Sequence, residues 1–186
     1  MKDIINNLLL AALVIGTGVY FYQRSHHPAA STTSQPLPGI SENYQAPVRA
    51  PPAGIPAEAW KYYEDAKEAV YNSDLARAEK DLAGAVRVKP DFTEAWYNLG
   101  ATQANIAIDI IRHDGSESAA VRKFREGVDS KKKARELMIQ GKWFEYQGEQ
   151  RTQTRYDVEQ ALEYADETLA NEPALIDAMR MWAGKE

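Results

Sequence analysis

The sequence predicts an all-α fold of stacked antiparallel helical hairpins, preceded by a single transmembrane helix and a proline-rich linker. Three observations predict this fold. An uncharged apolar run lies near the N-terminus, most of the prolines follow it directly, and from Pro56 onward apolar residues recur every three or four positions, the period of a helix packed on one face. The 186 residues therefore divide into a transmembrane helix (1–24), an extended linker (25–56) and a helical domain (57–186).

The apolar run near the N-terminus is long enough to cross a bilayer. Residues 4–22 are 19 in number, close to the ~20 that a spanning helix needs. The run ends in Tyr20-Phe21-Tyr22, with Arg24 behind it, a pattern typical of the membrane–water interface. The alternative is a cleaved signal peptide with Gly16-Thr17-Gly18 beside the cut, but such a cut leaves only a short apolar core. We therefore expect a retained anchor in a lipid bilayer.

The orientation of this anchor rests on a nearly balanced set of charges. The N-terminus and Lys2, offset by Asp3, stand on one side, and Arg24 stands on the other. We expect a single-pass membrane protein with the N-terminus inside. The C-terminal domain is then extracytoplasmic, which means periplasmic if the chain is bacterial.

The linker is recognised by its prolines, since seven of the nine fall within it. They are Pro28, Pro36, Pro38, Pro47, Pro51, Pro52 and Pro56. The residues between them are mostly small or polar, and no apolar period survives, so we expect an extended tether.

Two helices and a turn are predicted directly after the linker. Pro56 suits a first helical turn, and an apolar stripe of Ala59, Tyr62, Tyr63, Ala66 and Val70 follows it. Asn72-Ser73-Asp74 interrupts the stripe. A second stripe of Leu75, Ala78, Leu82, Ala85, Val86 and Val88 then runs to Lys89-Pro90-Asp91, where the proline disfavours further helix. Two short helices joined by a tight turn make a helical hairpin.

The segment that follows this hairpin carries a family resemblance. Trp96, with Leu99-Gly100 three and four residues later, resembles the opening of a tetratricopeptide repeat, and the preceding Ala78, Leu82, Ala85 and Pro90 have the spacing of that family's second helix. The resemblance implies a solenoid of about three hairpins. Small residues such as Gly100 would let paired helices approach closely, and large ones such as Trp96 and Leu82 would fill the space between hairpins.

The later hairpins depart from the family's regular spacing. The second is expected to be longer or irregular, with a first helix that ends near His113-Asp114-Gly115-Ser116 and a returning helix that carries Ala120, Phe124 and Gly127. A third, degenerate unit is matched by Phe144, Gly148, Asp157, Ala161, Ala165 and Pro173. A final helix over 173–183 is expected to cap the open end.

The composition excludes several kinds of function. Hydrophobic residues make up 44% and charged residues 26%, as in ordinary globular proteins. The absence of cysteine excludes disulfides, thiolate metal sites and a cysteine nucleophile. A formal net charge of −5 argues against a nucleic-acid binder. With three histidines and no hydrolase or phosphate-loop motif, we expect no enzyme, no catalytic, cofactor or metal site, and no small-molecule substrate.

Two candidate binding surfaces are predicted. In tetratricopeptide repeats the first helix of each hairpin lines a groove that holds a partner, and the resemblance assigns to this groove Trp60, Tyr63, Lys67, Tyr71, Glu94, Tyr97, Asn98, Ala101 and Asn105. A basic patch for an acidic protein surface or anionic headgroups is predicted to comprise Arg122, Lys123, Arg125, Lys131, Lys132, Lys133 and Arg135. The alternative is that this patch and the acidic stretch from Asp157 to Asp177 offset each other in the folded chain.

Together these features predict a membrane-anchored, tetratricopeptide-like protein–protein interaction module. We expect it to act as a non-catalytic scaffold or accessory subunit of a membrane protein complex. The alternatives are a transient assembly factor or chaperone-like protein for membrane or exported clients, an enzyme with an unfamiliar site, and a secreted protein released by cleavage.

Overall fold

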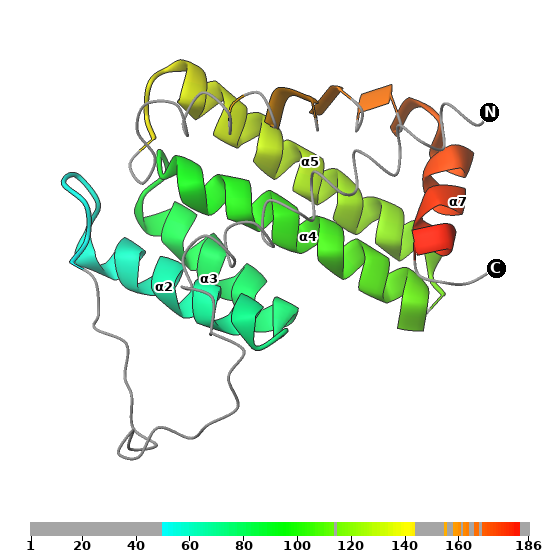
Figure 1. The fold of residues 1–186 in the computed structure, drawn as a ribbon, viewed down its shortest axis with the longest axis horizontal. Coiled ribbons are helices and arrows are strands. Elements are labelled where there is room, and N and C mark those ends of the chain that lie inside the picture. The colour runs from blue at the N-terminus through cyan, green and yellow to red at the C-terminus, as the bar shows by residue number, and fades with distance from the viewer. Residues whose placement is uncertain are drawn as a thin grey trace, which may run out of the picture.

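The computed structural model describes residues 50–113, 115–143, 155, 158–160, 162–163, 166–167 and 169–182. Every regular element among them is a helix, as predicted (Figure 1). The predicted anchor and the linker as far as residue 49 lie outside these residues, as do Phe144, Gly148, Asp157, Ala161 and Ala165 of the predicted third hairpin. Within the described part of the chain, no helix has both the length and the apolar character needed to cross a membrane.

The first hairpin consists of α2 (Ala57–Tyr71) and α3 (Leu75–Val88). Pro56 lies at the N-cap of α2, and its carbonyl accepts a hydrogen bond from the amide of Trp60 at 3.0 Å. Asp74 caps α3 by accepting a hydrogen bond from the amide of Arg77 at 3.0 Å. Ser73 takes a positive φ of 60° in the tight turn between the helices, at the break that the sequence predicts.

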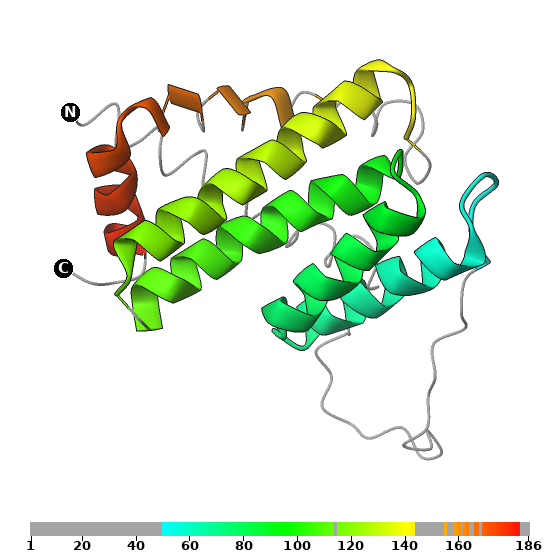
Figure 2. The ribbon, with the colours of Figure 1, turned by 180° about the vertical axis from the view of Figure 1, so that it is seen from behind.

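The second hairpin is longer than the first, as expected from its sequence. It consists of α4 (Thr93–His113) and α5 (Glu117–Ile139), and Gly115 makes the turn with a φ of 67°. α3 packs against α4, so the two hairpins are in direct contact (Figure 2). A Cβ atom on Gly100 of α4 would lie 2.7 Å from the carbonyl oxygen of Gly127 on α5. The two helices therefore cross with their backbones in contact, which confirms the close approach predicted at Gly100.

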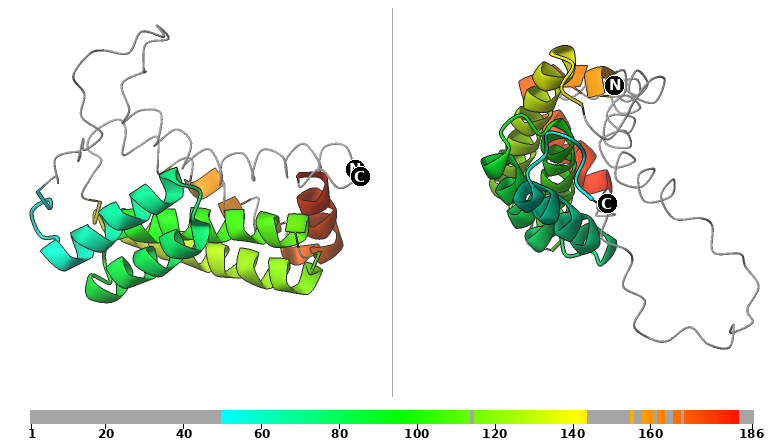
Figure 3. Two further views of the ribbon diagram at one scale, coloured as in Figure 1. Left: turned by 90° about the horizontal axis from the view of Figure 1, so that it is seen from below. Right: turned by 90° about the vertical axis from the view of Figure 1, so that its left-hand side faces the viewer.

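α7 (Glu172–Trp182) follows the partly described residues 155–171 and corresponds to the predicted final helix. Seen from below, the first hairpin lies at one end of the described helices and α7 at the other (Figure 3). Leu175 and Met179 of α7 are buried against the α4–α5 hairpin, and the guanidinium of Arg180 forms an ion pair with Glu117 in the first turn of α5.

Two apolar clusters form the core. The first joins the α2–α3 hairpin to the start of α4, and its ring contacts are made by Trp60, Tyr63 and Phe92. Ile55, within the predicted linker, is buried in this cluster, so the core begins before α2. The second cluster lies between α4, α5 and the C-terminal residues.

Trp96 differs from the prediction. Its side chain is only half-buried, and its indole Nε1 donates a hydrogen bond to the carbonyl of Pro90 at 2.9 Å. Leu82, by contrast, is fully buried as predicted. Phe92, which directly follows the turn, fills the position between the hairpins that the sequence assigned to Trp96.

Candidate partner-binding site

The structure divides the predicted groove residues of α2 and α4 by their exposure. Trp60, Tyr63, Glu94 and Ala101 are buried, so their side chains contribute to packing rather than to the surface. Lys67, Tyr97, Asn98 and Asn105 are half-buried, and Tyr71 at the end of α2 is 65% exposed. The solvent-accessible part of the predicted groove is therefore smaller and more polar than the sequence indicated.

One direct contact joins the predicted groove residues of α2 to those of α4. The amide nitrogen of Asn98 donates a hydrogen bond to the hydroxyl of Tyr63 at 3.0 Å, across 35 residues of sequence. The ammonium of Lys67 lies 5.5 Å from the centre of the Tyr63 ring and 2.9 Å from the carboxylate of Glu64. Tyr63 is completely buried, so its hydrogen bond to Asn98 fixes the first helices of both hairpins relative to each other.

A second group of contacts surrounds Tyr97 on α4. Its ring packs edge-on against Trp143 with the ring centres 6.0 Å apart, and the Nζ atom of Lys131 lies 3.2 Å above the ring centre. The stem of Lys131 occupies space left by Gly100, because a Cβ atom there would lie 2.7 Å from Cγ of the lysine. Lys131 is thus a buried residue of the α4–α5 interface, only 3% exposed, and not part of a surface patch.

Two opposing effects act on the charge of Lys131. Burial lowers the pKa of its amine well below 10.5. A positive charge over an aromatic face is stabilised by about 2 kcal/mol when it is desolvated, whereas removing an ammonium ion from water costs several kcal/mol. Desolvation is therefore the larger effect, and the folded protein favours the neutral amine more than the unfolded chain does.

The other residues of the predicted basic patch all lie on α5, but most of them are paired with carboxylates of this chain. Lys133 pairs within α5 with Glu136 at 3.1 Å, while Arg125, Lys132 and Arg135 face acidic residues from the C-terminal stretch. The structure thus favours the alternative in which the basic and acidic stretches offset each other.

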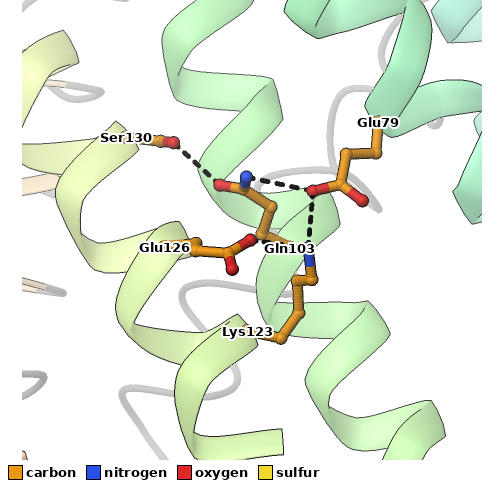
Figure 4. A network of polar contacts seen from close by, with 5 residues as sticks. All are labelled: Glu79, Gln103, Lys123, Glu126 and Ser130. Carbon is orange, nitrogen blue, oxygen red and sulfur yellow. Dashed lines mark hydrogen bonds and ion pairs between the residues drawn. The ribbon is translucent and has the colours of Figure 1, made fainter. Parts of the chain in front are cut away.

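A polar network joins three helices, and of its five residues the sequence analysis singled out only Lys123, as part of the predicted basic patch (Figure 4). The carboxylate of Glu79 on α3 accepts hydrogen bonds from the side-chain amide of Gln103 at 3.1 Å and from Lys123 at 3.0 Å. The hydroxyl of Ser130 donates to Gln103 at 2.7 Å, and Lys123 also bonds to Glu126. Gln103 and Ser130 are buried, so the network satisfies polar groups at the helix interface.

The network also changes the pKa of its lysine. Burial lowers the pKa of Lys123, but the bonds to Glu126 and Glu79 outweigh it, and the pKa is raised above 10.5. The network thus links α3, α4 and α5 through charged and polar side chains. Polar residues on the buried faces of α4 and α5 were the one sequence signal for it.

Among the described residues, no group of three or more histidine, aspartate or glutamate side chains is positioned to hold a metal ion. Compared with protein-family models, curated proteins and solved structures, the chain matches none of them.

Proposed function

We propose that this chain is a membrane-anchored, tetratricopeptide-like interaction module that acts as a non-catalytic scaffold or accessory subunit of a membrane protein complex. In this proposal residues 4–22 anchor the chain in the bilayer, and the helical hairpins hold a protein partner in the extracytoplasmic space. Anchoring makes the encounter with a membrane-bound partner effectively intramolecular, which raises its local concentration without additional contacts.

The observation that carries the proposal is the hydrogen bond between Asn98 and Tyr63. It joins the first helices of two successive hairpins, and in a tetratricopeptide-like solenoid these helices line the partner-binding surface. Lys67, Asn98 and Asn105 give this surface half-buried polar groups, and Tyr71 adds an exposed ring at its edge. Tyrosine is a favoured contact residue because it buries a large area with few rotatable bonds.

The test is a pull-down of the full chain from membranes in a mild detergent, with mass spectrometry of the co-purifying proteins. Tyr71→Ala should reduce recovery of the partner about tenfold if the ring is an anchor residue of the interface. Ile139→Ala is a matched control, since Ile139 is also exposed, at 52%, but lies at the end of α5. Equal recovery with both variants would contradict a binding surface at the edge of α2.

The stoichiometry of the recovered complex separates the two versions of this function. A partner recovered at a fixed ratio supports an accessory subunit. Sub-stoichiometric, salt-sensitive recovery of several clients supports a transient assembly factor or chaperone-like protein.

A further inference from the structure

Three exposed basic residues of α5 form an ordered series of ion pairs with the acidic C-terminal stretch. The pairs are Arg125 with Glu172 at 3.4 Å, Lys132 with Asp166 at 2.6 Å, and Arg135 with Glu159 at 4.0 Å. As the residue number rises along α5, the number of the acidic partner falls. The described residues between 155 and 172 therefore run antiparallel to α5 (Figures 1 and 2), and Glu159, Asp166 and Glu172 each face a basic residue of that helix.

These pairs lie at the surface rather than in the core. The side chains of Lys132 and Asp166 are 47% and 53% exposed, and those of Arg125 and Glu172 are 54% and 50% exposed. Exposed ion pairs contribute little stability and are screened by salt. They therefore favour one register of the two segments without binding them tightly together.

Apolar contacts are made on the inner side of the same segment. Val158 and Leu162, four residues apart, are buried in the second apolar cluster together with Met138 and Trp143. Residues 158–160, 162–163 and 166–167 are helical wherever the structure describes them. The described residues of this segment are therefore helical, and they combine two buried apolar side chains with acidic side chains on the outer side.

We propose that this face of α5 is a docking surface for an acidic amphipathic helix of a partner protein, and that the chain's own residues 155–172 occupy it as a displaceable competitor. The occupant defines the chemistry of the partner, namely carboxylates that match Arg125, Lys132 and Arg135, and two apolar residues spaced by four. This surface is separate from the face of α2 and α4, so it stands or falls independently of the function proposed above.

The experiment uses the detergent-solubilised full chain and a fluorescent synthetic peptide with the sequence of residues 155–182. Anisotropy should show saturable binding that weakens about tenfold between 50 mM and 500 mM sodium chloride. The double variant Asp166→Asn/Glu172→Gln weakens the resident segment, so that chain should bind the peptide about threefold more tightly. Lys132→Gln in the same double variant should reverse this gain.

A matched control is available one residue away on α5. Lys133 pairs with Glu136 of its own helix, so Lys133→Gln should leave the affinity for the peptide unchanged. The absence of saturable binding to the double variant overturns the proposal, as does binding that is indifferent to salt and to Lys132→Gln. A stable dimer of the unaltered chain also overturns it, by identifying the occupant as a second copy. Circular dichroism checks the fold of each variant, and the salt titration of the unaltered chain decides the question if a variant does not fold.

Discussion

At the scale of single residues, the crossing of α4 and α5 depends on the absence of a side chain at Gly100. A Cβ atom there would lie 2.7 Å from the backbone oxygen of Gly127, which has no freedom to move aside. Gly100→Ala should therefore destabilise the protein by about 1–3 kcal/mol, even though alanine favours the helix. Urea unfolding of the two proteins measures the difference.

Gly84 provides the control for this substitution. A Cβ atom there would lie 2.9 Å from the ring of Tyr62, a half-buried side chain that can turn away. Gly84→Ala should thus change the free energy of unfolding by less than about 1 kcal/mol. Equal losses for both variants would show that backbone contact at the crossing is not the cause.

Lys131 is a second residue whose environment predicts a measurable effect. Because burial lowers its pKa in the folded state, the unfolded chain binds more protons between the folded pKa and 10.5. The stability of the unaltered protein should therefore rise with pH through this window. Lys131→Met should remove this rise and increase stability at neutral pH by about 1–3 kcal/mol.

The measurement for Lys131 is urea unfolding at pH 7 and pH 10. Lys132→Met is the control, because Lys132 is an exposed neighbour paired with Asp166. If Lys131→Met lowers stability at both pH values, the contact with Tyr97 outweighs the desolvation of the amine, and the stated balance is wrong.

At the scale of elements, the contact between the hairpins depends on Phe92 more than on Trp96. Phe92 is completely buried against Tyr63 with the ring centres 4.9 Å apart, whereas Trp96 is half-buried. Phe92→Ala should cost about 3–5 kcal/mol, as large-to-small changes in a core do, and Trp96→Ala about 1–2 kcal/mol. Thermal or urea unfolding of both variants measures the two losses of stability. A larger loss for Trp96→Ala would show that Trp96, as the sequence predicts, is the main residue between the hairpins.

Helix ends and turns were predictable because local chemistry determines them. Pro90 stops α3 through its effect on the preceding residue, and Gly115 supplies the positive φ between α4 and α5. The position of Lys131 was not predictable in the same way. Three consecutive lysines, Lys131-Lys132-Lys133, are typical of a solvated helix face. Lys131 is buried only because α5 packs against α4 with this side chain facing Gly100, where no side chain occupies the space.

The turn between α3 and α4 is tied to the segment that follows α5 through Asp91. Its carboxylate pairs with Lys89 at 2.7 Å and with Lys142 at 3.2 Å. The bond to Lys89 is the main cause that lowers the pKa of Asp91 below 3.8; burial opposes the shift, and Lys142 adds to it. The stabilisation is thus complete above pH 3.8 and is lost as the pH falls through the lower, folded pKa.

Asp91→Asn should therefore destabilise the protein at neutral pH. In acid, the free energies of unfolding of the variant and of the unaltered protein should become more similar. Unfolding curves between pH 2 and pH 6 measure this convergence. Lys89→Gln should reproduce more of the effect than Lys142→Gln, and the reverse order would contradict the assigned cause.

At the scale of the whole molecule, the described part of the core lies well beyond the predicted anchor in sequence. Both apolar clusters are built from described residues that begin at Ile55, well beyond residues 1–24. The contacts that join distant segments, such as Lys132 with Asp166, arise only once the chain has folded, so their register could not be read from the composition of either stretch. The sequence analysis nevertheless included the alternative that the basic stretch and the acidic stretch offset each other in the folded chain.

This separation predicts how the chain responds to loss of its N-terminus. Removal of residues 1–24 should leave a helical domain that unfolds cooperatively, because the residues of both clusters are retained. The same deletion should transfer the protein from the membrane fraction to the soluble fraction, since the apolar run of residues 4–22 is lost. Removal of residues 29–44 of the linker is the control, because it spares both parts and should leave the chain in the membrane fraction. A truncated protein that aggregates or lacks the helical circular dichroism spectrum would show that the N-terminal segment is part of the fold and not only its anchor.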